Sequence, residues 1–116
     1  MARLLWRARL HQPRDFKAAL EQGRRIGGKL LTAVIRANGL PHPRLGLALA
    51  KKNIAHATMR NRIKRQIRES FREQQSRLPA VDIVVFARPA AAAAPAAQLR
   101  AALDELWSRT IQQCAA

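Results

Sequence analysis

The sequence ATMRNRIKRQIRESFREQQSR occupies residues 57–77 and contains neither glycine nor proline. An uninterrupted run of this length is typical of one long α-helix, in which successive residues are rotated by about 100°. Four apolar side chains recur every fourth residue and would share one side of that helix: Met59, Ile63, Ile67 and Phe71. The stretch therefore predicts an amphipathic helix whose apolar side packs against the rest of a small domain.

The opposite side of this predicted helix carries almost only positive charge. We call its residues the basic stripe: Asn61, Lys64, Arg65, Arg68 and Arg72, with Arg62 widening it and Arg60 at its border with the apolar side. A solvated helix face usually mixes both signs, because opposite charges one turn apart stabilise a helix and like charges destabilise it. The basic stripe therefore predicts a polyanionic partner.

The composition of the whole chain agrees with such a partner. Its 116 residues include 22 Lys and Arg against 7 Asp and Glu, a formal net charge of +15. A compact domain with this imbalance repels itself, and phosphate is the anion that the arginine fork binds best. No stretch approaches the roughly 20 apolar residues that span a bilayer. Together with the single Cys114, which has no internal disulfide partner, these features predict a cytoplasmic nucleic-acid-binding protein without a membrane partner.

Turn and cap signals divide the rest of the chain. They predict a short helix from Pro13 that Gly23 ends, strands over 29–37 and 44–50, the long helix, a strand over 82–88, and a terminal amphipathic helix with Leu99, Leu103, Leu106, Trp107 and Ile111. The order α-β-β-α-β-α predicts an α+β fold with a small mixed sheet. We expect one RNA-binding domain over 1–116, with a basic N-terminal segment over 1–12 anchored by Trp6 and Leu10 and an Ala- and Pro-rich loop over 89–97.

Residues 44–50 (RLGLALA) alternate between large and small side chains. One side of this predicted strand carries Leu45, Leu47 and Leu49, which we assign to the core. The other side carries Arg44, Gly46, Ala48 and Ala50 and is nearly bare. Two interpretations remain open: the bare side lets an extended ligand approach the backbone, or it makes room for a packed helix.

An ordered set of motifs closely resembles the signature of the bacterial ribonuclease P protein family. These motifs are RL at 9–10, DF at 15–16, HPRLGL at 42–47, KKN at 51–53, RNRIKRQIRESFR at 60–72 and LPAVD at 78–82. The resemblance implies an α-β-β-α-β-α fold with a left-handed β-α-β crossover, as in domains of ribosomal proteins. It also implies a function in tRNA processing, as the protein subunit of a ribonucleoprotein endonuclease. Such a subunit binds a catalytic RNA and assists the Mg²⁺-dependent hydrolysis that removes the 5′ leader of precursor tRNA.

The resemblance also assigns two binding surfaces. The residues expected to contact the catalytic RNA are Arg60, Asn61, Arg62, Lys64, Arg65, Arg68 and Arg72. The residues expected to line a leader-binding cleft are Phe16, Leu20, Arg44, Gly46, Ala48, Lys51 and Lys52. Family members often carry several aromatic residues on the first helix and first strand, whereas here Phe16 is alone there. Because base stacking contributes about 1–3 kcal/mol per aromatic residue, we expect weaker or more charge-dependent leader binding.

The chain itself offers no recognisable active site. His11, His42 and His56 lack a Ser, Cys or acid at a nucleophile–base spacing, and the scattered carboxylates predict no metal site. We therefore expect no catalytic residues in the protein and Mg²⁺ bound only through the RNA. Two alternatives are a structural RNA-binding protein of the ribosomal kind and a major-groove DNA binder. The ordered motifs favour the interpretation as a ribonuclease P protein over these two alternatives. We therefore expect no DNA partner.

Overall fold

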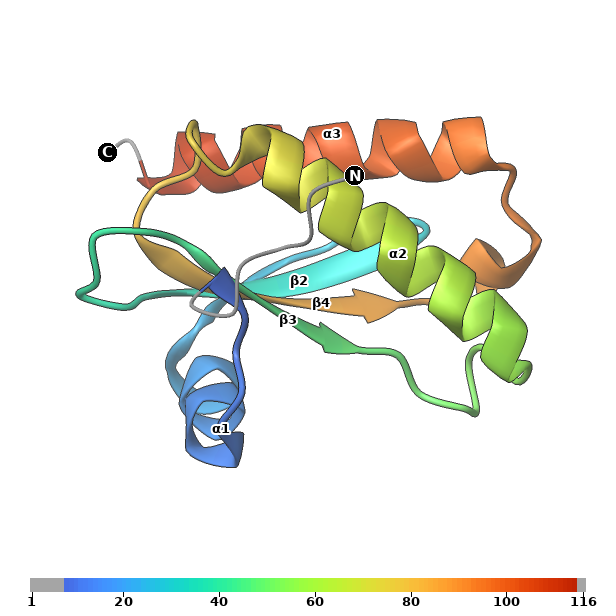
Figure 1. Cartoon of the computed structure of the whole chain (residues 1–116), viewed down its shortest axis with the longest axis horizontal. Helices are drawn as coiled ribbons and strands as arrows, with labels where there is room; N and C mark the ends of the chain where they lie inside the picture. The colour runs from blue at the N-terminus through green and yellow to red at the C-terminus, as the bar shows by residue number, and fades with distance from the viewer. Residues whose placement is uncertain (1–7, 115–116) are drawn as a thin grey trace.

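The computed structural model describes residues 8–114 and confirms the predicted α+β class (Figure 1). In chain order, the elements are α1 (Pro13–Gln22), β1 (Arg24–Ile26), β2 (Leu31–Ala37), β3 (Arg44–Ala48), α2 (Ala57–Gln74), β4 (Val81–Ala87), the 3₁₀ helix η2 (Pro89–Ala93) and α3 (Ala96–Cys114). The predicted order lacked β1 and the short 3₁₀ helix η2. That strand has three residues, of which only Ile26 is buried, so the sequence contains no apolar alternation that could reveal it.

The four strands form one mixed sheet in the order β1-β2-β4-β3. β4 lies at its centre, antiparallel to β2 and parallel to β3. Because β3 and β4 are parallel neighbours joined through α2, they form the β-α-β crossover that the family resemblance implies. The left hand of that crossover stays a prediction.

One face of the sheet is covered by α2 and α3, which run across it side by side (Figure 1). Ile63, Ile67 and Phe71 of α2 are buried there, as their spacing predicts, while Met59 is half-buried. The Trp107 ring of α3 packs edge-on against Phe71 at a centroid distance of 5.8 Å. Its Nε1 donates a 2.7 Å hydrogen bond to Ser70 Oγ. The buried indole is thus satisfied, and the two helices are joined by contacts that fix their relative position.

Of the helices between residues 8 and 114, α1 is the one on the other face of the sheet, and it projects below the strands in Figure 1. A small apolar cluster lies between them, formed by Leu10, Ala19 and Val84 with Phe16, Ala48 and Phe86 half-buried around it. Of the two predicted N-terminal anchors, Leu10 is buried and Trp6 lies outside the described residues.

Several boundaries differ from the prediction. The first predicted strand begins at Leu31 rather than at residue 29, and the long helix ends at Gln74 rather than at residue 77. The predicted loop over 89–97 is partly regular, because residues 89–93 form η2 and residues 96–97 already belong to α3. Ala91 of η2 is only 2% exposed and joins the main core. Low complexity concealed this helix, since alanine fits both a loop and a tightly packed turn.

Candidate nucleic-acid interface

The two long sides of α2 differ in charge. Asn61, Arg62 and Arg65 of the basic stripe are exposed, and Lys64, Arg68 and Arg72 are half-buried. The acidic residues Glu69 and Glu73 instead line a groove toward α3, together with Arg100 and Asp104. The negative charges of the helix are therefore turned toward its neighbour, which leaves the stripe almost purely positive.

Arg60 behaves differently from the rest of the stripe. Its Nη1 donates hydrogen bonds to the carbonyl oxygens of Ile54 and Ala55, at 2.8 and 2.9 Å. The guanidinium group therefore folds back onto the segment that leads into α2, which its expected contact with the catalytic RNA did not anticipate. Because the N-cap residue His56 makes no side-chain capping bond, Arg60 helps to fix the start of the helix.

Near the C-terminal half of the stripe, three arginine side chains are partly withdrawn from solvent. Burial lowers the pKa of Arg68, and the nearby positive charge of Arg9 lowers it further. The Nε atoms of Arg9 and Arg72 are buried and have no hydrogen-bond partner among the residues that the structure describes.

The α1 face of the sheet contains the predicted leader-binding residues Phe16 and Gly46 in direct contact. A Cβ atom added to Gly46 would come within 2.7 Å of Phe16 Cε1 and 2.8 Å of Leu10 Cδ1. The packing interpretation is therefore confirmed at Gly46, which is buried beneath these side chains. Ala48, the next residue on that side of the strand, remains half-buried.

Phe86 is a second aromatic residue on this face that the sequence analysis missed. It pairs with Ala48 in the sheet register and is half-buried beside it. The alternation of Asp82, Val84 and Phe86 places it on the same side of β4 as Val84, and this parity would have identified it. The expectation that Phe16 is the only aromatic residue on the first helix and first strand is correct, and Phe86 of β4 adds a second aromatic side chain to the same face.

Arg44 forms ion pairs with two acidic side chains of the protein itself, Asp82 and Asp15. Its Nε and Nη2 donate two 2.8 Å hydrogen bonds to the two carboxylate oxygens of buried Asp82. Its Nη1 lies 3.6 Å from Asp15 of α1, and Asn38 donates a further bond to Asp82. The hydrogen bond to Asp82 raises the pKa of Arg44 against the opposing effect of burial. Arg44 therefore connects α1 to the sheet, which its predicted role as a leader contact did not anticipate.

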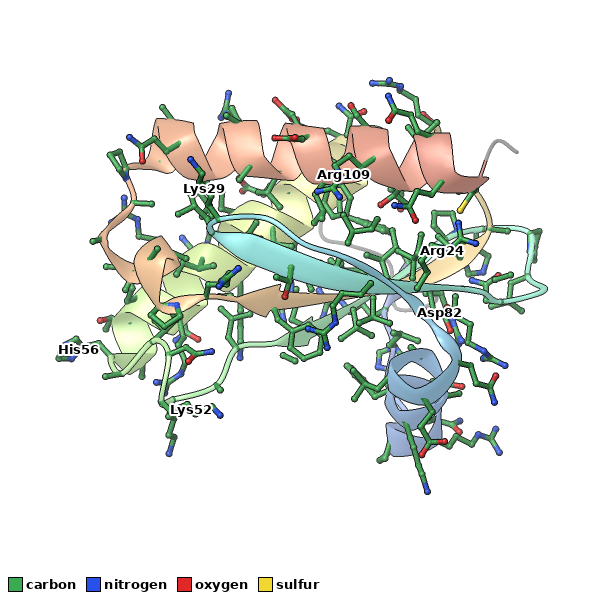
Figure 2. The ribbon with its side chains drawn as sticks, turned by 180° about the vertical axis from the view of Figure 1, so that it is seen from behind. Arg24, Lys29, Lys52, His56, Asp82 and Arg109 are labelled. Carbon is green, nitrogen blue, oxygen red and sulfur yellow. The ribbon has the colours of Figure 1, made fainter. Side chains whose placement is uncertain are left out.

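The remaining predicted leader residues lie at two separate places. Leu20 of α1 is 50% exposed. Lys51 and Lys52 are exposed in the turn after β3, and Figure 2 shows Lys52 at the end of the sheet away from α1. Asn53 Nδ2 donates a 3.1 Å bond to the Ala87 carbonyl, which fixes this turn to the end of β4. Phe16, Gly46 and Ala48 are thus brought together, whereas the two lysines lie apart from them, in the turn that follows β3.

None of the helices between residues 8 and 114 is long and apolar enough to cross a membrane. Within the same range, no three His, Cys, Asp or Glu side chains come together in a group that could hold a metal ion.

Comparison with known proteins finds consistent relatives. The family model described as Ribonuclease P matches residues 5–111. The chain is 46% identical over 101 residues to the ribonuclease P protein component of Salmonella arizonae, covering 87% of this chain and 85% of that protein. It is 40% identical over 106 residues to that of Nitrosococcus oceani, covering 91% and 89%.

Solved structures give the same result for the fold. The RNase P protein of Staphylococcus aureus superimposes with a TM-score of 0.80 at 31% identity, covering 84% of this chain and 90% of that chain. The RNase P protein of Thermotoga maritima superimposes with a TM-score of 0.78 at 31% identity, covering 87% and 96%.

Proposed function

The chain belongs to the bacterial ribonuclease P protein family and is a protein subunit of ribonuclease P, in which we propose that α2 binds the catalytic RNA and the α1 face of the sheet binds the 5′ leader of precursor tRNA. RNA binding and tRNA processing follow from the family, as does membership of a ribonucleoprotein endoribonuclease. The assignment of each surface to one RNA is our proposal.

The separation of charge on α2 supports the contact with the catalytic RNA. Arg62, Lys64 and Arg65 have no acidic partner among the described ion pairs, and the acids of the helix line the groove toward α3. An unbalanced row of cations on a rigid helix binds phosphates without reading sequence. This surface fits a folded RNA whose backbone passes along the helix.

The composition of the α1 face supports the contact with the leader. Phe16 and Phe86 are half-buried around the small Ala48, so part of each ring is open to a base that could stack on it. Gly46 provides the space that Phe16 occupies, and Leu20 extends the apolar surface along α1. Lys51 and Lys52 supply charge at the other end of the face for a strand that runs along the sheet.

We assign catalysis to the RNA subunit and its Mg²⁺ ions. The protein contributes charge neutralisation and substrate positioning, which lower the barrier without a protein nucleophile. A precursor tRNA partner and a cytoplasmic location belong to this proposal.

The α2 assignment is tested with the double variant Arg62→Gln/Arg65→Gln. If wild type neutralises about five phosphates, log affinity for the catalytic RNA should fall against log salt with a slope of roughly −3.5 to −4.5. Losing two contacts should flatten the slope by about 1.4–1.8. The matched control Arg24→Gln/Arg100→Gln removes the same charge from β1 and α3. An unchanged slope in the folded α2 variant, or an equal change in the control, would contradict the assignment.

A further inference from the structure

The N-terminal segment fixes Arg9 at the edge of the sheet. Arg9 forms a parallel bridge with Leu45 of β3, and the N–H of Leu10 donates a 2.9 Å bond to the Leu45 carbonyl. The neighbours of Arg9 are both buried, Ala8 in the main core and Leu10 in the cluster beneath α1. Its backbone is therefore held from both sides of the sheet, so its side chain starts from a fixed point.

Arg68 and Arg72 of α2 lie one helical turn apart, and both side chains are half-buried. Arg9 is near enough to Arg68 for its charge to lower the pKa of Arg68, and burial of Arg68 acts in the same direction. Arg9 and Arg68, which are far apart in the sequence, thus lie close together, and Arg72 follows Arg68 one turn further along the same side of α2.

No described acid balances these three charges. The ion pairs in the described part of the chain involve Lys17 and Arg44 alone among the cations. The Nε atoms of Arg9 and Arg72 are buried without a hydrogen-bond partner among residues 8–114. Arg44, by contrast, lies at the same end of the sheet with two hydrogen bonds to Asp82. Like charges that are partly dehydrated and unpaired destabilise the free protein, and an external anion would relieve this cost.

We propose that Arg9, Arg68 and Arg72 form a seat for one phosphodiester group of an RNA strand. A phosphodiester carries one negative charge and two free oxygens, which suit the planar donors of two or more guanidinium groups. The seat lies at the β3 edge, between the basic stripe and the α1 face. The inference rests on the proposed RNA-binding function and adds Arg9 to it. Because Arg68 and Arg72 belong to the basic stripe, we assign the phosphate to the catalytic RNA, with the leader as the other source of the same chemistry.

The test uses Arg9→Gln in the full chain, with Arg24→Gln as a control that removes one exposed arginine from β1. Arg9→Gln should weaken binding to the catalytic RNA about tenfold, since hydrogen bonds between charged groups are lost. It should flatten the salt slope by about 0.7–0.9, the value for one phosphate. The melting temperature of the free protein should stay the same or rise, because one of three mutually repelling charges has been removed. This combination of weaker binding and undiminished stability separates a phosphate seat from a packing role.

A second arm identifies the source of the phosphate. Assembled holoenzyme is titrated with precursor tRNA and with mature tRNA at saturating protein. A loss confined to precursor tRNA supports the seat and assigns its phosphate to the leader, and a loss in binding to the catalytic RNA alone assigns it there. A lowered melting temperature with an unchanged salt slope overturns the proposal. If Arg62→Gln/Arg65→Gln weakens binding to the catalytic RNA and Arg9→Gln weakens binding to neither the catalytic RNA nor precursor tRNA, only the seat fails. If neither variant weakens binding to any of these RNAs, the α2 surface itself fails.

Discussion

The two faces of the sheet have opposite characters although the same strands build them. β4 contributes fully buried Ile83 and Val85 to the face beneath α2 and α3, and Val84 and half-buried Phe86 to the face beneath α1. Two long helices cover the first face, and one short helix covers part of the second (Figure 1). The first face therefore supplies most of the burial that stabilises the fold. The second keeps apolar surface partly open, which is what a binding surface requires.

The largest expected effect comes from the closed face. Phe71→Ala removes a fully buried ring that packs against Trp107. It should lower the free energy of unfolding by about 3–5 kcal/mol. Urea denaturation followed by circular dichroism measures this change. A loss as small as that of Phe16→Ala on the open face would contradict the difference between the faces.

An intermediate effect is expected where α1 is attached to the open face. Asp82→Asn removes the carboxylate that accepts two bonds from Arg44, and it should destabilise the protein by about 1.5–3 kcal/mol. Leader affinity should fall as well, because Asp82 no longer holds Arg44, the residue that also contacts Asp15 of α1. Asp15→Asn, which removes only the 3.6 Å contact with Arg44, is the control and should cost less. Equal losses in the two variants would argue against Asp82 as the main partner.

The smallest expected effect on stability comes from the open face itself. Phe16→Ala should lower the unfolding free energy less than Phe71→Ala, because its ring is only half-buried. It should weaken holoenzyme binding to precursor tRNA with a long leader by about 1–3 kcal/mol, the contribution of one stacked base. Binding affinities for precursor and mature tRNA, measured side by side, check this.

The substrate pair serves as the internal control for Phe16→Ala, since only precursor tRNA carries leader nucleotides. Leu20→Ala on the same helix removes an exposed aliphatic side chain that cannot stack, and its effect should be smaller. Equal losses for both tRNAs together with a large drop in stability would assign Phe16 to the core.

Periodicity was sufficient to predict the elements with long, regular patterns. The burial of Ile63, Ile67 and Phe71 follows from their spacing, and the alternation around Leu45 correctly separates the two sides of β3. β1 was not predicted, because its three residues include two exposed arginines and show no apolar alternation. η2 was not predicted, because its burial depends on where the preceding strand ends. That position is set by the tertiary structure and not by the local sequence.

The sequence predicted which residues lie in the candidate site, but not the contacts that each of them makes. Charge and spacing identified the basic stripe, but they could not show that Arg60 bonds to carbonyl groups of the preceding segment or that Arg44 pairs with Asp82, which lies 38 residues away. Arg9 and Phe86 come from segments that only the fold brings to the interface. Contacts over such separations depend on the sheet register, which the local sequence does not encode.

The placement of arginine at the margins of the sheet also affects how copies of the free protein meet. An exposed edge strand can pair with the edge of another molecule and start aggregation. One edge of this sheet is the three-residue β1 with exposed Arg24 and Arg25. The other, β3, is capped in part by the bridge at Arg9. Two such edges carry like charge, so the arginines that attract RNA also disfavour pairing between the sheet edges of two free copies.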